Sequence, residues 1–225
     1  MSDPSPPPPP PLTRAQRFRR FVIRRLWAYP LIYIGVVLVF LALERSLVFH
    51  PSSPAESWFE PVDARTQDVF FTDANGTKLH GWWLPPADPA DGAVLVAHGN
   101  GGNVTHRGSL AAGLRHTLGA GVLLFDYPGY GKSEGKPTEE SCYASGEAAY
   151  SWLMNEAHIP SNRILLLGES LGGGVAVELA TRREHRALVL IYTFSSLPDA
   201  AKFHYPWLPT KWLMRTRFDN LAKIG

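Results

Sequence analysis

The sequence GESLG at residues 168–172 has the residue types and spacing of a turn that presents a serine for nucleophilic attack. It follows the apolar run ILLL at 164–167 and precedes a segment at 171–182 with helical composition. Between a buried strand and a helix, G-x-S-x-G describes a sharp turn that raises the serine above a sheet, and its glycines avoid collisions with the strained backbone. We therefore predict Ser170 as the nucleophile, with a Gly-Ser turn without chemistry as the alternative.

A serine nucleophile also needs two backbone amides that face the negatively charged oxygen of the tetrahedral intermediate. Leu171, directly after the serine, is predicted to supply one amide. The second is expected from the loop HGNGGN at 98–103, which follows the apolar run AVLVA, and Asn100 is its predicted donor. The loop lacks the Gly-Lys-Ser/Thr sequence of a phosphate-binding loop, which argues against a nucleotide site. His98 is interpreted as structural, because the general base is expected after the last strand.

The elements that must position these residues alternate along the chain. Short apolar runs predict six strands, and the segments between them predict three helices. The strands are expected at 67–72, 78–84, 93–97, 121–125, 164–167 and 187–192, and the helices at 104–117, 138–156 and 171–182. Asn75 and Gly76 predict a tight hairpin turn with positive φ values between the first two strands. The fold class is therefore α/β, with an antiparallel hairpin followed by the β-α-β units of a mostly parallel sheet.

Composition and charge limit the class of protein. The 225-residue chain is 45% apolar, which suits one mid-sized globular domain with a short appendage. Its net charge is +2, and residues 1–27, with six arginines and one aspartate, carry +5, so the remainder carries −3. A weakly acidic body argues against nucleic-acid binding. The single cysteine, Cys142, excludes an intrachain disulfide and a cysteine-based zinc cluster, and no metal or cofactor is predicted.

Residues 26–43 form an uncharged run of 18 residues, about 27 Å long as a helix, close to the thickness of a bilayer's hydrocarbon layer. The run predicts one membrane span, with a cleaved signal peptide and a buried core helix as the alternatives. Pro30 falls in the first turn of this span. Arginines precede the run and little positive charge follows it, so the N-terminus is predicted to be cytoplasmic and the domain to lie on the other side. The proline-rich stretch at 4–11 predicts an extended spacer.

Three motifs occur in order along the chain: HGNGGN, FDYPGYGKSEGKP at 125–137 and GESLGGG at 168–174. Together they resemble the membrane-anchored α/β-hydrolase-domain serine hydrolases, which include monoacylglycerol and lysophospholipid lipases and protein depalmitoylases. The resemblance covers about residues 45–225 and implies an α/β-hydrolase fold with its first six strands present. In such a fold Asp126 is expected to be structural, capping its loop by hydrogen bonds to backbone amides.

This resemblance and the apolar run divide the chain into three predicted parts. Residues 1–25 are a proline- and arginine-rich cytoplasmic tail, and residues 26–43 are a single transmembrane helix. Residues 44–225 are the α/β-hydrolase domain, which is expected to lack its C-terminal strands. The chain stops about where a seventh strand should start, so we expect the sequence to be incomplete and weakly active as given.

The acid and the general base of the family have no matching positions here. In the family's chain order an acid and then a histidine follow the serine, on loops after later strands. After Ser170 the sequence holds only His185, which precedes a strand, and His204, which follows it. His204 is therefore a weak candidate for the base, and Asp199 is a weak candidate for the acid.

The resemblance implies a serine hydrolase that cleaves carboxylic esters or thioesters of acyl or lipid substrates at a membrane, through an acyl-enzyme on Ser170. The expected partners are the lipid bilayer and a lipid or acylated substrate, and no nucleic acid. A prolyl-type serine peptidase, which shares the serine turn, is a second hypothesis. A non-catalytic membrane-anchored module, which the missing histidine favours, is a third.

Overall fold

The computed structural model describes residues 11–224, so the predicted proline spacer at 4–11 lies almost wholly outside the described residues. The chain divides into two compact units, Met1–Ala42 and Leu43–Gly225. The second unit begins one residue before the domain predicted at 44–225.

The first unit contains most of helix α1 (Arg14–Val48), whose last turns belong to the second unit. The helix begins after Thr13, because the Thr13 hydroxyl accepts the Gln16 amide (3.3 Å) and the Gln16 side chain accepts the Thr13 amide (2.9 Å). It therefore starts well before the predicted span, and Pro30 lies inside the helix and not in its first turn. α1 is long and apolar enough to cross a membrane. Signal sequences and the core helices of soluble proteins can have the same length and composition.

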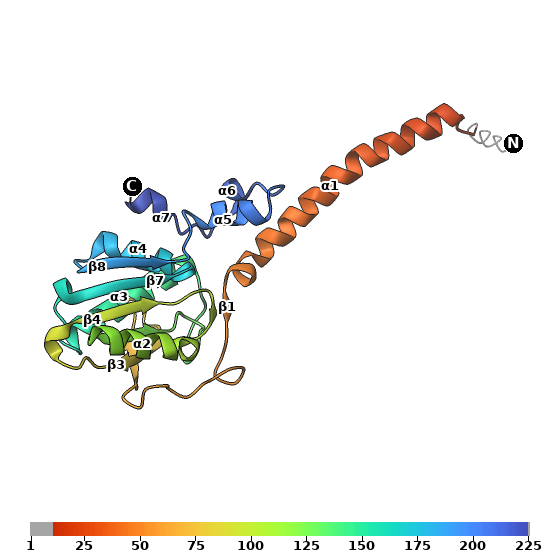
Figure 1. Ribbon diagram of the computed structural model, residues 1–225. Helices are drawn as coiled ribbons and strands as arrows, with labels where there is room; N and C mark the ends of the chain where they lie inside the picture. The colour runs from red at the N-terminus through yellow and green to blue at the C-terminus, as the bar shows by residue number, and fades with distance from the viewer. Residues whose placement is uncertain (1–10, 225) are drawn as a thin grey trace. The chain divides into compact units, whose positions relative to one another are not determined.

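The second unit is built on a six-stranded sheet with the strand order β2-β3-β6-β4-β7-β8 (Figure 1). Its strands are β2 (Gln67–Thr72), β3 (Lys78–Leu84), β4 (Ala93–Ala97), β6 (Gly121–Phe125), β7 (Ile164–Glu169) and β8 (Ala187–Ile191). β3 is antiparallel to β2 and β6, and the remaining neighbours are parallel. The six predicted strands and the mostly parallel α/β class are thereby confirmed. Ala97 and Gly168 are in register, so the loops after β4 and β7 leave the same edge of the sheet.

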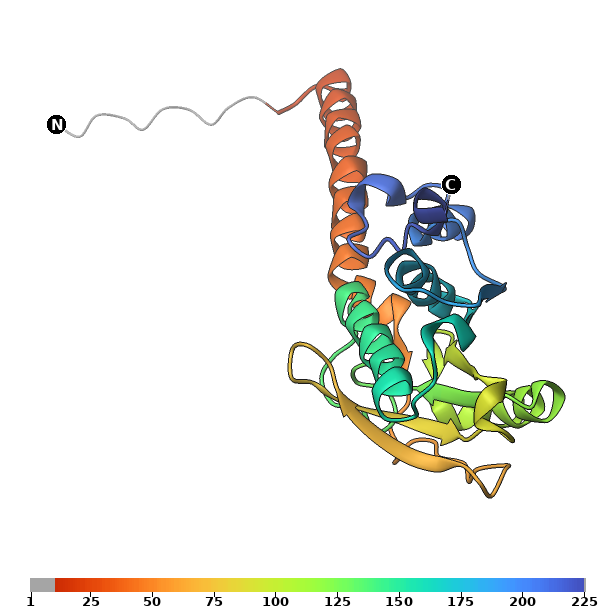
Figure 2. The ribbon, with the colours of Figure 1, turned by 90° about the vertical axis from the view of Figure 1, so that its left-hand side faces the viewer.

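Helices cover both faces of this sheet, as the edge-on view in Figure 2 shows. α2 (Gly108–Leu118) packs on one face with alternate strand residues such as Val94. α3 (Glu139–Asn155) and α4 (Leu171–Arg182) cover the other face and contact the intervening residues, such as Leu95. Because successive strand side chains point to opposite faces, a central strand between two helical layers is apolar at every position. All five residues of β4 are buried accordingly.

The hairpin between β2 and β3 differs from the predicted turn. Gly76 has a positive φ of 83°, but Asn75 does not. The Asp73 carboxylate accepts the amides of Asn75 (2.9 Å) and Thr77 (2.8 Å), which closes a longer loop than a two-residue turn. The side-chain cap at Asp73, and not a pair of positive φ values, therefore shapes this connection.

After β8 the chain makes an excursion with two short helices, α5 (Leu197–His204) and α6 (Thr210–Leu213). The Leu197 amide donates to the Arg217 carbonyl (2.7 Å), which closes the excursion at its base. Helix α7 (Asn220–Ile224) follows and contacts α4.

Candidate active site

Ser170 stands at the carboxyl end of β7 in a conformation that non-glycine residues rarely adopt. Its φ is 52° and its ψ is −113°. Strain of this kind is typical of functional turns, and it persists only where the surroundings hold it. The Ser170 amide donates to the Ile191 carbonyl (2.8 Å), and the Ser170 carbonyl accepts the Gly173 amide (3.0 Å) and the Thr193 hydroxyl (2.9 Å). The predicted strand, turn and helix are thus present, with a half-buried serine at the turn.

The glycines around Ser170 are required by close backbone contacts. A Cβ atom at Gly168 would lie 2.6 Å from the Gly172 carbonyl oxygen. A Cβ atom at Gly172 would overlap the carbonyl group of Ala97, in the neighbouring strand β4. Since backbone atoms cannot move aside as a flexible side chain can, these contacts explain why the motif has glycine on both sides of the serine.

The predicted oxyanion loop lies beside the serine. A Cβ atom at Gly99 would lie 3.6 Å from the Ser170 Cβ. Leu171 is the first residue of α4, and the amide of a first helical residue has no partner within its own helix. The Asn100 amide donates no hydrogen bond within residues 11–224. The structure therefore brings Ser170 next to two loops whose amides are available to bind a negatively charged oxygen.

The end of α1 and the residues that follow it hold this loop in place, a contact that the sequence did not predict. The Asn100 side chain donates to the Val48 carbonyl (3.0 Å), and the His50 amide donates to the Asn100 carbonyl (3.0 Å). β1 (His50–Pro51) and β5 (Gly101–Gly102) then form a short parallel pair. The position of Asn100 is therefore fixed by residues some fifty positions earlier in the chain.

Two buried tyrosines of the FDYPGYG segment support the same loop from beneath. Tyr127 donates its hydroxyl to the His98 carbonyl (2.6 Å), and Tyr130 donates to the Asn100 carbonyl (2.7 Å). Burial raises the pKa of both phenols, so they stay protonated and remain donors. These two hydrogen bonds fix the backbone of the loop at His98 and at Asn100.

Asp126 is the centre of a buried polar cluster, and its carboxylate accepts a backbone amide from outside its own loop instead of capping that loop as predicted. Its carboxylate accepts the Val104 amide (2.9 Å) and pairs with His80 Nδ1 (3.1 Å), and His98 Nε2 lies 3.6 Å away. Burial acts to raise the pKa of Asp126, but the hydrogen bond from His80 and the nearby His98 outweigh it and hold the pKa below its usual 3.8. The carboxylate therefore stays ionised and ties the end of β6 to Val104, in the segment that follows the loop at 98–103.

Sequence reasoning missed an ion pair between Arg107 and Glu169. Arg107 Nε and Nη2 each lie 3.0 Å from a different carboxylate oxygen of Glu169, the residue before the serine. Arg107 Nη1 also donates to the Gly101 carbonyl (3.3 Å) in the loop at 98–103. Arg107 ends a 3-10 turn, η2 (Val104–Arg107), where a continuous helix from residue 104 was predicted. The available signal was Glu169 itself, a carboxylate at a buried strand end that needs a partner.

The structure does not join the two weak candidates for acid and base. The Asp199 carboxylate binds Lys211 (2.8 Å) and the hydroxyl of Ser196 (2.8 Å). Both contacts lower the pKa of Asp199, and the contact with Lys211 has the larger effect. His204 is exposed at the end of α5 and contacts the ring of Phe203. Five positions along a helix correspond to a rotation of about 140°, so the two side chains leave different faces of α5. Within residues 11–224, no hydrogen bond links either residue to the Ser170 hydroxyl.

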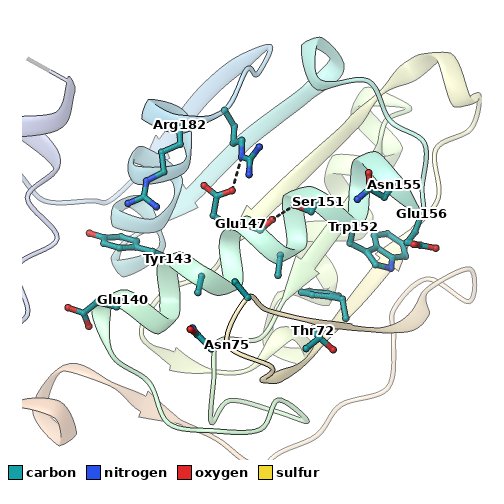
Figure 3. Close-up of a pocket in the computed structure, with 15 residues that line it drawn as sticks. Thr72, Asn75, Glu140, Tyr143, Glu147, Ser151, Trp152, Asn155, Glu156 and Arg182 are labelled. Atoms are coloured by element: carbon teal, nitrogen blue, oxygen red, sulfur yellow. Dashed lines mark hydrogen bonds and ion pairs between the residues drawn. The ribbon is translucent and has the colours of Figure 1, made fainter.

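A hollow of about 680 Å³ lies elsewhere on the second unit, between the β2–β3 hairpin and α3 (Figure 3). Its lining includes Tyr143, Trp152 and the ion pair between Glu147 and Arg183 (2.7 Å). None of its lining residues belongs to the serine turn or to the loop at 98–103. Within the described part of the chain, no three His, Cys, Asp or Glu residues are grouped to hold a metal ion.

A mostly parallel sheet with a strained serine between strand and helix defines a class of hydrolases, and the comparison with known families agrees. The model of the α/β hydrolase fold family matches residues 92–222, more than half of the chain. The chain belongs to the α/β-hydrolase fold family.

The chain is also similar to a protein of Mycobacterium tuberculosis and to two solved structures. The uncharacterized protein Rv2307c of Mycobacterium tuberculosis is 37% identical over 210 residues, which cover 90% of this chain and 74% of that protein. An α/β hydrolase of Vibrio vulnificus matches with a TM-score of 0.61 and 21% identity, over 72% of this chain and 59% of that structure. An esterase of Pyrococcus furiosus matches with a TM-score of 0.55 and 26% identity, over 74% of this chain and 64% of that structure. The chain spans less than two thirds of the length of both solved proteins.

Proposed function

We propose that the chain is a serine hydrolase that cleaves carboxylic esters or thioesters of acyl or lipid substrates, with Ser170 as its nucleophile. The observation that carries this proposal is the strained serine between β7 and α4, with its φ of 52° and the glycine of the HGN loop against it. Similarity to an esterase of Pyrococcus furiosus supports an ester as the substrate class.

In the proposed reaction the Ser170 oxygen attacks the acyl carbonyl carbon while a base takes the hydroxyl proton. The former carbonyl oxygen then carries a negative charge, and the amides of Leu171 and Asn100 would donate to it. When the intermediate collapses, the alcohol or thiol leaves with the proton, and an acyl ester remains on Ser170. Water attacks this ester, releases the carboxylic acid and restores the serine.

The one weak candidate for this base, His204, is not joined to the serine in the structure. His204 is exposed and, within residues 11–224, its ring contacts Phe203 and makes no hydrogen bond to the Ser170 hydroxyl. A serine hydroxyl without a paired base is a weak nucleophile, and a site without one triad member keeps only about 10³–10⁴-fold catalysis over water. The 225-residue chain is therefore proposed to react slowly, through its oxyanion loop and its serine turn.

The proposed substrates follow from a proposed location. The 18-residue uncharged run at 26–43 is long enough to cross a membrane once, and six arginines precede it, which favours a cytoplasmic N-terminus. The hydrolase domain would then lie on the non-cytoplasmic side. Acyl and lipid esters gather at a bilayer surface, so an anchored hydrolase would meet them there at high local concentration.

The test is covalent labelling of the full chain with a fluorophosphonate, which reacts with activated serines. We expect slow labelling of the unchanged chain and, at the same rate, of Ser151→Ala, which removes a half-buried serine of α3 remote from the turn. Ser170→Ala should lose labelling completely while keeping the far-ultraviolet circular dichroism of the fold. Labelling that survives in Ser170→Ala would show that another residue is the nucleophile.

Substrate class is tested on the same proteins with p-nitrophenyl esters of increasing acyl length, acyl thioesters and aminoacyl amides. We expect slow turnover of esters or thioesters and none of amides. A preference for aminoacyl amides would replace this proposal with a peptidase. Turnover that is lost in His204→Ala would identify His204 as the base in spite of its exposed position.

A further inference from the structure

Residues 197–217, here named the aromatic excursion, present large aromatic side chains to solvent. Phe203 is 84% exposed and Trp212 is 90% exposed, and Tyr205 and Trp207 are partly exposed. Soluble proteins seldom expose several large aromatic groups together, and such groupings mark interaction surfaces. We therefore expect the aromatic excursion to bind another molecule or a membrane.

The aromatic excursion is a fixed structure, so its exposed rings are held outward. The Leu197 amide donates to the Arg217 carbonyl (2.7 Å) at its base. Inside it, Lys211 pairs with Asp199 (2.8 Å) and bridges α6 to α5. Leu208 is buried and anchors the segment between the two helices. Phe203 on α5 and Trp212 on α6 are thus displayed by a closed loop that is tied together internally.

The charge of the excursion is opposite to that of the rest of the unit. It contains four basic residues, Lys202, Lys211, Arg215 and Arg217, and one acidic residue, Asp199. Residues 44–196 instead contain 11 basic and 17 acidic residues. A cationic segment on an acidic body is attracted to anionic surfaces in one orientation only, because the remaining faces are repelled. Aromatic rings combined with lysine and arginine are the composition of segments that lie in the headgroup layer of a membrane.

A contact within the second unit fixes the excursion next to the end of the uncharged run. The Glu44 carboxylate is buried and accepts the amides of Arg215 (3.0 Å) and Thr216 (2.7 Å). Glu44 is the first residue after the run at 26–43. If that run crosses a bilayer, as proposed above, its end lies at the membrane surface, and residues 215 and 216 lie there with it.

We propose that the aromatic excursion is a membrane-binding surface whose occupant is the headgroup layer of an anionic phospholipid bilayer. Phe203 and Trp212 would enter the layer between headgroups, and Lys202 and Arg215 would face the lipid phosphates. This inference rests on the proposed span and extends it, because it states which face of the hydrolase unit meets the lipid. The contact would hold the excursion, which follows the carboxyl end of β8, against the surface from which an acyl substrate arrives.

The experiment uses the full chain in a Cys142→Ala background, with single cysteines at Phe203, Trp212 or Leu118 labelled with a nitrobenzoxadiazole dye. Leu118 is the matched control, because it is exposed but precedes β6 and so lies at the opposite edge of the parallel strands. In vesicles of phosphatidylcholine and phosphatidylglycerol, dyes at 203 and 212 should be quenched by spin-labelled lipid and shielded from aqueous iodide. The dye at 118 should show the reverse. Equal access of iodide to all three dyes would overturn the proposal.

A second set of variants tests the charges. Lys202→Gln with Arg215→Gln should reduce lipid quenching at 212 at least twofold and remove its dependence on phosphatidylglycerol. Lys78→Gln with Lys136→Gln, which removes two exposed lysines elsewhere, should leave it unchanged. If the two double variants reduced lipid quenching at 212 equally, the effect would depend on overall charge and would contradict the proposed surface.

Two further readouts separate this inference from the proposals that precede it. Extraction with alkaline carbonate reports whether the run at 26–43 spans the membrane, and fluorophosphonate labelling reports the serine. A chain that carbonate extracts overturns the span and this inference together. If the chain resists carbonate extraction but the dyes at 203 and 212 remain open to iodide, this inference alone is overturned. It is also overturned alone if a protein partner shields both dyes equally well in the absence of lipid.

Discussion

At the scale of single residues, the serine turn combines strain with several contacts that resist its relaxation. A serine at φ 52° and ψ −113° costs about 1–3 kcal/mol relative to ordinary backbone, and the turn persists because its neighbours constrain it. The Arg107–Glu169 pair contributes to this constraint from the other side, since it joins the residue before Ser170 to the Gly101 carbonyl. Its side chains are 19% and 28% exposed, so solvent screens the pair only in part.

We predict that Arg107→Ala lowers the rate of fluorophosphonate labelling at Ser170 about tenfold, equal to about 1.4 kcal/mol in the barrier. The reason is that Glu169 and the oxyanion loop would lose their common partner. Arg183→Ala is the matched control, because it breaks the Arg183–Glu147 ion pair on the far side of α3 and should leave labelling unchanged. An equal slowing in both variants, or none in Arg107→Ala, would show that the pair does not position the site.

At the scale of elements, the site depends on how closely α4 approaches β4. Gly172, in the first turn of α4, packs so closely on the Ala97 carbonyl that an added Cβ atom would overlap it. The same approach sets the distance between the serine turn and the loop after β4, because β4 and β7 are neighbouring parallel strands in register. Strand pairing and helix packing together therefore decide whether two amides converge on one oxygen.

Replacing this glycine tests the packing. Gly172→Ala should lower the free energy of unfolding by about 1–3 kcal/mol, because its Cβ would overlap backbone that cannot shift without moving β4. Gly113→Ala, at an exposed position of α2 with nothing within 4 Å of the added atom, should be neutral or stabilising by up to about 1 kcal/mol. Urea unfolding followed by tryptophan fluorescence measures both. A Gly172→Ala midpoint equal to that of the unchanged chain would contradict the close approach.

At the scale of the whole molecule, the chain joins a long apolar helix to a folded α/β unit. The junction is structured within the second unit: Glu44 is bound by two amides near residue 215, and the Val48 carbonyl accepts the Asn100 side chain. The end of α1 is thus part of the α/β unit, with direct contact to the loop at 98–103. An anchor attached in this way would also stabilise the loop on which catalysis is proposed to depend.

The proposed topology predicts the outcome of proteolysis. In sealed inside-out vesicles, whose cytoplasmic face is on the outside, residues 60–225 should resist an added protease, because the domain would lie in the lumen. After detergent opens the vesicles, the same protease should reach the domain, which controls for intrinsic resistance of the fold. Digestion of the domain while the vesicles remain sealed would reverse the proposed orientation.

The sequence alone was sufficient for the features that depend on neighbouring residues. Strand, serine turn and helix follow one another at 164–182, so local apolar pattern and glycine spacing predicted them together. The six strand segments and the HGN loop were likewise predicted from short runs with clear boundaries, although their order in the sheet was not. The hairpin turn at Asn75 was predicted wrongly, because the side-chain cap at Asp73 competed with the Asn-Gly turn that the sequence suggested.

Only the tertiary structure decided which distant residues support the site. Arg107 and Glu169 are 62 positions apart, and Glu44 and Arg215 are 171 positions apart. Such pairs have no local signature, because they meet through crossover connections that place β4 between β6 and β7 and return the chain after β8 to the end of α1. A charged or polar side chain in the sequence shows that a partner is needed, since burial without one is costly. Which partner it finds depends on the packing of the whole sheet and its helices.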